Sequence, residues 1–236
     1  MANLQKGVLD KVEQFLKKKD FSFEVIVVDD GSKDGSIEFA ENFCKENPNF
    51  TLIKNKHLGK AGAVTAGVLA SIGDYVLFTD MDQATPINEI DKLLPFIEDG
   101  FDVVIGSRSS RRKGAPWTRV VMARGMIMLR SFIIGIKGVS DTQCGFKMFK
   151  KEAAKKLFSK MSDFHNGYKV VSGSNVAAGF DVELLYLAQK MGYKIKEVRV
   201  EWLYVETRRV SPLRDSIDGF IDLLRIKKDD LKGKYN

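Results

Sequence analysis

The chain has 236 residues, of which 44% are hydrophobic and 29% are charged. This length and balance suit one folded domain with a sizeable core, so an intrinsically disordered chain is excluded. No apolar stretch reaches the roughly 20 residues that cross a bilayer, so no membrane span is expected. The start of the chain also lacks the apolar segment of an export signal, which predicts a cytoplasmic protein.

Lysine and arginine together number 38, against 31 aspartates and glutamates, and the net charge is +7. This excess favours anionic partners such as nucleotides, phosphates or an anionic membrane surface, without choosing among them. Nucleic acid is not expected as a partner, because no basic and aromatic recognition motif accompanies the charge. The two cysteines, Cys44 and Cys144, rule out a disulfide framework, and no cysteine–histidine cluster has the spacing of a zinc site.

Apolar runs rich in β-branched residues alternate with amphipathic segments, which predicts an α/β domain whose mostly parallel sheet is flanked by helices. The predicted helices are 4–16, 37–44, 85–100, 118–134, 151–160, 182–191 and 212–231. The predicted strands are 23–30, 51–54, 75–80, 102–106 and 195–202. In the third helix, Thr85 is the expected N-cap and Gly100 the expected stop.

No internal repeat or linker divides the chain, so residues 1–236 are expected to form a single domain. Within it, residues 162–179 are rich in turn-forming residues and predict an insertion, with a hairpin as one form. The helix predicted at 212–231 is amphipathic, and basic residues gather toward its C-terminal end and just beyond it.

Acidic residues follow two of the predicted strands, at the sheet edge where open α/β sheets bind ligands. Asp80 and Asp82 come directly after the strand at 75–80, and in extended geometry their carboxylates point the same way. They could share one hard cation that bridges diphosphate oxygens, or they could be a solvated pair at a loop end. Asp30 follows the strand at 23–30, where it could bind a base or ribose or could belong to a capped turn.

Basic residues offer two further kinds of phosphate contact. Lys60 lies among small residues just before a further expected helix, which suits approach to a phosphate, although close packing explains the small residues equally well. Two basic stretches next to apolar residues suit either plain solvation or docking to an anionic membrane. Their members are Arg108, Arg111, Arg112, Lys113, Arg119 and Arg124 in the first, and Arg225, Lys227, Lys228, Lys232 and Lys234 in the second.

Six short motifs, in this order along the chain, together resemble one family. They lie at residues 25–36, 80–82, 106–108, 141–147, 180–188 and 210–216, and their cores include Asp-Asp-Gly-Ser, Asp-x-Asp and Gln-Cys-Gly-Phe-Lys. The resemblance is to the inverting family 2 glycosyltransferases of the GT-A fold, most closely to the dolichyl-phosphate β-glucosyltransferases. It extends from about Phe21 to Tyr235.

The resemblance implies transfer of glucose from UDP-glucose to a polyprenyl phosphate such as dolichyl phosphate, with inversion, by a protein peripherally associated with the cytoplasmic face of a membrane. An acceptor phosphate is already anionic, so alignment and charge stabilisation would carry the reaction without a strong base. The implied roles are Asp30, Lys60 and Asp80 for the donor, Asp82 with Asp80 for Mg2+ or Mn2+, Arg108 and Arg124 for the acceptor phosphate, Asp141 as an orienting group beside the acceptor, and Arg208 or Arg209 over the diphosphate.

Other readings remain open beside this one. A mannosyl- or N-acetylglucosaminyltransferase acting on the same lipid would carry the same motifs. So would a degenerate module that binds a nucleotide sugar without turnover. Two departures from the family pattern bear on the choice: its first strand is not recognised here, because the sequence starts in what resembles the following helix, and residues 162–179 differ from the usual approach to the motif at Phe180.

Overall fold

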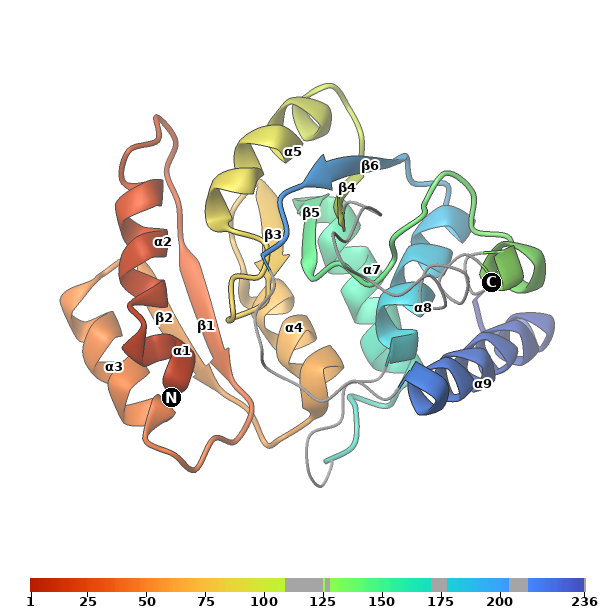
Figure 1. The fold of residues 1–236 in the computed structure, drawn as a ribbon, viewed down its shortest axis with the longest axis horizontal. Coiled ribbons are helices and arrows are strands. Elements are labelled where there is room, and N and C mark those ends of the chain that lie inside the picture. Colours follow the sequence, from red (N-terminus) through yellow and green to blue (C-terminus); the bar gives the residue numbers. More distant parts are fainter. Residues whose placement is uncertain (109–124, 126–127, 171–177, 204–211, 236) are drawn as a thin grey trace.

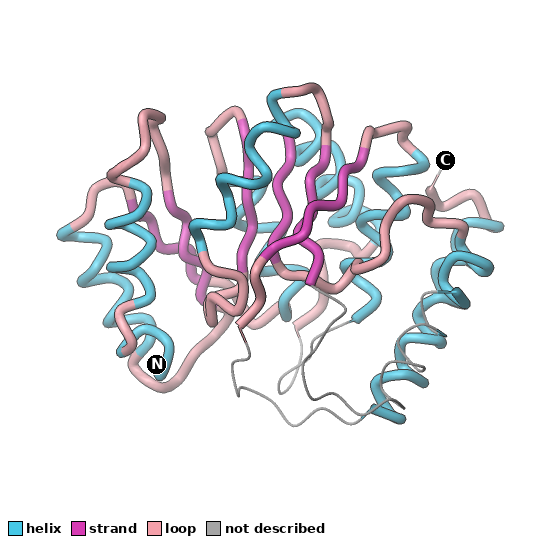
Figure 2. Tube along the Cα trace, turned by 45° about the horizontal axis from the view of Figure 1, so that its top comes forward, coloured by secondary structure: helices cyan, strands magenta, loops and turns pink. Residues whose placement is uncertain are grey.

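The computed structural model describes residues 1–108, 125, 128–170, 178–203 and 212–235. Helices lie on both faces of a sheet that is built in two parts (Figures 1 and 2). The strands are β1 (Val25–Asp29), β2 (Phe50–Lys54), β3 (Tyr75–Thr79), β4 (Val103–Arg108), β5 (Phe146–Lys150) and β6 (Ile195–Val200). The helices are α1 (Ala2–Gln5), α2 (Val8–Leu16), α3 (Ser36–Glu46), α4 (Gly59–Ala70), the short 3-10 turn η1 (Ile87–Glu89), α5 (Ile90–Glu98), α7 (Lys151–Phe164), α8 (Ala178–Lys190) and α9 (Pro212–Leu231).

The larger part of the sheet has the strand order β3-β5-β4-β6. β4 runs parallel to β6, and among the described strands of this part only β5 is antiparallel to its neighbours, β3 and β4. Sequence reasoning did not predict β5. Its position has a useful consequence: because β3 and β4 are both antiparallel to β5, they run in the same direction and end at the same edge.

Side chains of the larger part alternate between two cores, as the two-residue period of a strand requires. Val103 and Ile105 face the core that α4, α7 and α8 cover, and Val104 faces the smaller core under α5. In β5, Phe149 belongs to the first core and Met148 to the second. Lys147 therefore points toward the face covered by α7 and α8, where it is fully buried.

The smaller part of the sheet consists of β1 and β2, which are parallel. Together with α1, α2 and α3 they enclose a separate apolar core around Val27 and Phe50. Among the strands that the structure describes, β1 pairs only with β2, and β3 only with β5. α4 contacts both β1 and β3 and so joins the two parts (Figure 1).

Most predicted elements are confirmed, with three differences. The first helix is broken at Gly7, whose φ of 68° is left-handed. The expected cap at Thr85 is wrong: the helix starts through a 3-10 turn without a side-chain cap, and Thr85 is buried with its Oγ1 3.7 Å from Cys144 Sγ. In the predicted insertion at 162–179, α7 continues to Phe164, residues 165–167 form a turn and 168–170 have no regular structure. Residues 171–177 lie outside the described residues, and α8 begins at Ala178.

The helix predicted at 118–134 is only partly described, and residues 128–134 are helical. No described helix combines the length and the hydropathy that crossing a membrane requires.

Candidate functional site

The turn after β3 carries the two aspartates of the Asp-x-Asp motif. The backbone of Asp80 is bound to the loop before β5, since its N–H donates a hydrogen bond to the Gly145 carbonyl over 3.2 Å. The Asp82 carboxylate accepts the Ala84 N–H over 3.0 Å, which closes the turn, and Gln83 between them takes a left-handed φ of 50°. The Asp80 side chain is 45% exposed, so the turn presents it at the sheet edge.

Gly145 is pressed against the Asp80 carboxylate. A Cβ at this position would lie 1.9 Å from Asp80 Oδ2, which no side chain tolerates. The glycine of the Gln-Cys-Gly-Phe-Lys motif therefore makes room for the first aspartate of the Asp-x-Asp motif. Two motifs that are far apart in sequence form one structural unit here.

Lys60, in the first turn of α4, is the cationic neighbour of this turn. Its Nζ lies 2.9 Å from Asp80 Oδ1 and 3.9 Å from Asp181 Oδ2 at the start of α8. Burial lowers the pKa of Lys60, but the carboxylates of Asp181 and Asp80, with Asp82 further away, outweigh it and raise the pKa above its usual value. Lys60 is therefore a charged ammonium between two carboxylates.

Asp181 has a second cationic partner in Lys147. Lys147 Nζ lies 2.6 Å from Asp181 Oδ1 and also donates to the Cys144 carbonyl. The Lys147 side chain has no exposed surface and that of Asp181 is only 5% exposed. A buried charge of this kind is stable only beside a partner of opposite charge, and Lys147 and Asp181 are such partners for each other.

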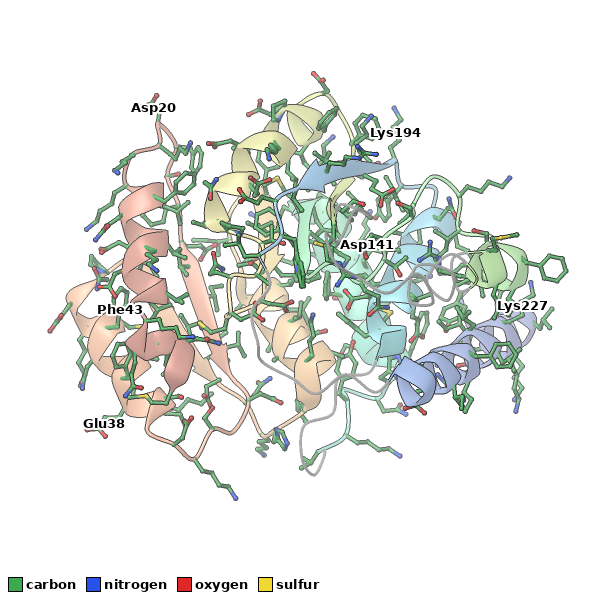
Figure 3. All side chains as sticks on the ribbon, in the orientation of Figure 1. Asp20, Glu38, Phe43, Asp141, Lys194 and Lys227 are labelled. Atoms are coloured by element: carbon green, nitrogen blue, oxygen red, sulfur yellow. The ribbon has the colours of Figure 1, made fainter. Side chains whose placement is uncertain are left out.

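Arg108, the last residue of β4, forms a second charged pair with Asp141, whose position Figure 3 labels. Two parallel contacts join them, Nε to Oδ2 at 2.7 Å and Nη2 to Oδ1 at 2.8 Å, and the Arg108 N–H adds a third at 3.0 Å. Burial raises the pKa of Asp141, but the hydrogen bonds and charge of Arg108 outweigh it, so the pKa lies below its ordinary value. The guanidinium also lies over the Trp202 ring, 5.9 Å from its centroid.

The Arg108–Asp141 pair and the Lys60 cluster are electrostatically connected. Burial lowers the pKa of Arg108, yet hydrogen bonding and charge from Asp141, and at longer range the charge of Asp181, raise it above the usual value. Asp181 thus acts on both Lys60 and Arg108. The strand ends of β3 and β4 accordingly bring one acidic turn and two cationic side chains to one edge of the sheet.

Glu197 on β6 holds the loop that carries Asp141. Its carboxylate accepts the Ser140 N–H at 2.9 Å, the Ser140 hydroxyl at 2.7 Å and the Asp141 N–H at 2.8 Å. Burial raises the pKa of Glu197, but these hydrogen bonds and one from Ser107 bring it below the ordinary value. Glu197 therefore remains ionised and fixes the backbone of Asp141.

Asp30 is committed to the start of α4. Its two carboxylate oxygens accept the N–H groups of Leu58 and Gly59, each over 2.7 Å, which satisfies two donors at the helix N-terminus. Through Asp30, the loop after β1 fixes the segment that carries Lys60.

Three predicted site residues, Arg124, Arg208 and Arg209, lie outside the described residues. Sequence reasoning in turn assigned no role to Lys147, Asp181 or Glu197. A signal was present for the first two, since each is a charged residue within an apolar run, but its partner is distant in sequence. Lys147 pairs with Asp181 in α8, and Glu197 pairs with the loop at Ser140.

The aspartate turn fits one kind of metal site. Among the described residues, no three histidine, cysteine, aspartate or glutamate side chains come together, so an all-protein cage is not formed there. Mg2+ instead is commonly held by one or two carboxylates, with substrate phosphates and water completing the shell. Asp80 and Asp82 supply that donor set.

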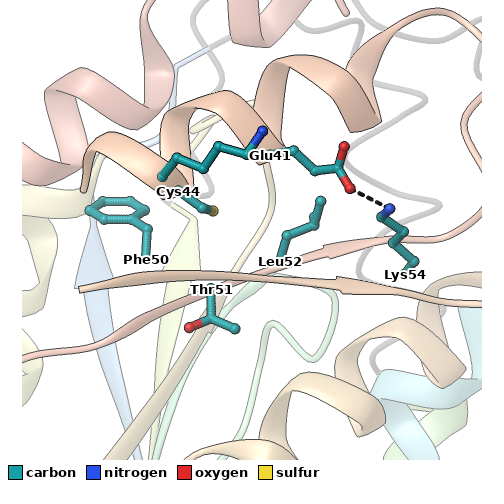
Figure 4. A pocket seen from close by; sticks show the side chains of 7 residues that line it. Glu41, Cys44, Phe50, Thr51, Leu52 and Lys54 are labelled. Atoms are coloured by element: carbon teal, nitrogen blue, oxygen red, sulfur yellow. Dashed lines mark ion pairs between the residues drawn. The ribbon is translucent and has the colours of Figure 1, made fainter. Parts of the chain in front are cut away.

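A cavity of about 400 Å3 between α3 and β2, with the Glu41–Lys54 ion pair at its rim, shares no residue with this site (Figure 4).

A family model described as "Glycosyl transferase family 2" matches residues 3–158. The dolichyl-phosphate beta-glucosyltransferase of Dictyostelium discoideum is 34% identical over 237 residues, which cover 94% of this chain and 69% of the relative. The human protein of the same name is 32% identical, with 97% and 72% covered. The Saccharomyces cerevisiae protein of that name is 33% identical, with 94% and 69% covered.

Two solved structures share the fold. Mannosyl-3-phosphoglycerate synthase from Rubrobacter xylanophilus has a TM-score of 0.63 at 16% identity and matches 96% of this chain and 69% of its own. A mannosyltransferase from Pyrobaculum calidifontis, solved with GDP-Man and Mn2+, has a TM-score of 0.58 at 18% identity and matches 93% and 61%. At these identities the likeness concerns the fold alone.

Proposed function

The chain belongs to glycosyltransferase family 2 and has the GT-A fold, and from this we propose that it transfers glucose from UDP-glucose to a polyprenyl phosphate such as dolichyl phosphate. The names of the curated relatives support glucose as the sugar and dolichyl phosphate as the acceptor. The observation that carries the proposal is the meeting of the Asp80–Asp82 turn and Arg108 at the common edge where β3 and β4 end.

The acceptor side of the proposal rests on Arg108. A lipid phosphate is anionic before it reacts, so it needs a positively charged group to align it and no base to deprotonate it. Asp141 holds the guanidinium by two parallel hydrogen bonds, which fixes its orientation before the acceptor arrives. Asp141 is thus an orienting group, and Arg124 is proposed as a second phosphate contact.

The donor side rests on Asp82, Asp80 and Lys60. A Mg2+ or Mn2+ ion held by the two aspartates would neutralise charge that develops on the departing uridine diphosphate. Lys60 lies 2.9 Å from Asp80 and is long enough to reach a neighbouring diphosphate oxygen. Asp30 keeps the first turn of α4 in place for this, and Arg208 or Arg209 would cover the diphosphate. Attack by the phosphate oxygen on the opposite face of the anomeric carbon gives inversion.

The acceptor is a lipid, so the protein must meet a membrane, and we place it peripherally on the cytoplasmic face. α9 supports this through basic residues that accompany exposed apolar ones. The basic residues are Arg225, Lys227 and Lys228 on α9 and Lys232 just beyond it.

The test is a transfer assay with purified protein, radiolabelled UDP-glucose, a short polyprenyl phosphate and Mn2+. We expect a glucosyl lipid, and a drop in rate on the order of a hundredfold or more in Asp82→Ala, because the charge on the leaving group is no longer compensated. Asp99→Ala, which removes an exposed aspartate after α5, is the control and should keep the full rate.

The same assay separates the other readings. Transfer from GDP-mannose or UDP-N-acetylglucosamine in preference to UDP-glucose would replace the proposed donor. Binding of nucleotide sugar without any transfer would make the protein a binding module. Full activity of Asp82→Ala would remove the role given to the metal.

A further inference from the structure

Lys60 occupies the place where a cation beside Asp80 is expected. Its Nζ is 2.9 Å from Asp80 Oδ1, which is a direct ion pair. The other carboxylate oxygen, Oδ2, lies closer to the Gly145 backbone, where a Cβ would come within 1.9 Å. Lys60 therefore occupies Oδ1, and a metal ion that binds this oxygen has to displace the ammonium.

The charges of the cluster make this competition effective. Lys60 and Lys147 carry two positive charges, and Asp80, Asp82 and Asp181 carry three negative ones, so the five groups leave one negative charge in excess. Lys147 has no exposed surface and is held by Asp181 Oδ1 and the Cys144 carbonyl, so it cannot move to serve another carboxylate. Lys60 is the movable member, with a flexible side chain that is 22% exposed.

A second carboxylate is ready to receive Lys60. Asp181 Oδ2 lies 3.9 Å from its Nζ, at the outer limit of an ion pair. Lys147 occupies the other oxygen of the same carboxylate, so Oδ2 is the oxygen left for Lys60. The ammonium can leave Asp80 without losing all compensation of its charge.

We propose that Lys60 is an internal competitor for the divalent cation: its ammonium neutralises Asp80 while no cation is bound, and cation binding moves it off Asp80, toward Asp181 and the diphosphate. The inference rests on the cation site of the proposed function. It assigns the buried Lys147–Asp181 pair a positioning role, since this pair keeps the second carboxylate in place. It also couples metal and nucleotide, because the diphosphate stabilises the displaced ammonium.

The experiment measures Mn2+ binding to the full chain without any nucleotide, by the loss of the electron paramagnetic resonance signal of free Mn2+. Lys60→Met removes the charge but keeps an unbranched side chain, and we expect it to bind Mn2+ about tenfold more tightly, because an ammonium in direct contact no longer competes. Lys60→Arg keeps the charge and should bind as the wild type does.

Lys17→Met is the matched control. Lys17, at the end of α2, also pairs with a carboxylate, Glu13 at 2.6 Å, but its side chain is 61% exposed and away from the Asp80 turn, so its loss should leave Mn2+ binding unchanged. Circular dichroism and the melting temperature establish that each variant is folded. The double variant with Asp82→Ala and Lys60→Met should lose the gain in Mn2+ affinity.

An unchanged or weaker affinity of folded Lys60→Met overturns the inference, and so does the absence of Mn2+ binding by this variant. An equal gain in Lys17→Met overturns it as well, because the effect is then one of net charge. Turnover does not enter this measurement. A tighter Mn2+ site in a protein that transfers no sugar would support the role of Lys60 while contradicting the proposed transfer.

Discussion

Gly145 is a residue whose role is decided by a neighbour 65 positions earlier in the chain, Asp80. Gly145→Ala would place a methyl group on the Asp80 carboxylate, and either the carboxylate or the loop before β5 has to move. Forcing an extra carbon into a packed site costs about 1–3 kcal/mol of stability. We expect weaker Mn2+ binding and slower transfer, together with a lower melting temperature.

Gly125→Ala is the matched control for this substitution. It adds the same methyl group in a helical residue where no atom of the described residues lies within 4 Å, so it should leave Mn2+ binding unchanged. Wild-type Mn2+ affinity in Gly145→Ala would show that Asp80 tolerates displacement and does not contribute to the cation site.

Glu197 gives a second prediction at this scale, because its carboxylate holds the loop that carries Asp141. In the wild type, two carboxylate oxygens of Glu197 accept hydrogen bonds from Ser140 and Asp141. Glu197→Gln leaves a single amide oxygen as acceptor, so part of this loop loses its hydrogen bonds. The Ser140 donors are exposed and can turn to water, so the lost hydrogen bonds cost about 0.5–1.5 kcal/mol each. We expect the KM for the polyprenyl phosphate to rise while the KM for the nucleotide sugar stays the same.

Separate titrations of donor and acceptor measure this split. Glu201→Gln changes an exposed carboxylate just beyond the same strand and should alter neither KM. If Glu197→Gln raised the KM of the donor alone, the assignment of Arg108 and Asp141 to the acceptor side would be wrong.

At the scale of elements, α9 presents two apolar faces. Leu223 and Ile226 are buried in the core that includes α8, whereas a second stripe faces outward at a spacing of three and four residues. The exposed stripe consists of Ile217, Phe220, Ile221 and Leu224. An exposed apolar stripe next to basic residues is typical of a helix that lies in a membrane interface.

We expect the protein to sediment with vesicles that contain anionic phosphatidylserine, less so as salt is raised. Ile221→Ser should weaken this binding by about tenfold, because burying a large aliphatic side chain contributes about 1.5–3 kcal/mol. Ile72→Ser removes an isoleucine that is 74% exposed outside α9, and it should bind as the wild type does. Equal losses in both variants would argue against a specific role of α9.

Elements with a clear period were predictable from the sequence, and those shaped by distant partners were not. β1 and β3 follow from their apolar runs, and α9 follows from its amphipathic period. β5 was missed because Lys147 and Lys150 interrupt its apolar residues, and only the Asp181 contact explains why Lys147 can be buried. The site divides in the same way: Asp82 and Arg108 stand at readable strand ends, whereas Glu197 acquires its role only from the loop that β6 meets in space.

At the scale of the whole molecule, the divided sheet predicts uneven stability. The part made of β1 and β2 has two strands among the residues that the structure describes, and such a pair depends on the helices packed against it. Besides α4, an ion pair of 2.6 Å between Lys19 and Asp91 connects this part to α5, but exposed pairs of this kind add about 0–1 kcal/mol.

Hydrogen exchange followed by mass spectrometry measures the difference. Backbone amides of β1 and β2 should exchange faster than those of β4 and β5, which have strand partners on both sides. The core strands of the larger part serve as the internal control in the same sample. Uniform protection across all these strands would mean that the two parts unfold together.

The complete burial of Lys147 also has a practical consequence for covalent labelling. Acylating reagents modify amines that they can reach, and in the folded protein they reach Lys60, whose side chain is 22% exposed, but not Lys147, whose side chain has no exposed surface. The two lysines therefore form a built-in footprinting pair. Acylation of Lys147 marks molecules whose interior has opened, whereas acylation of Lys60 alone marks molecules that remain closed.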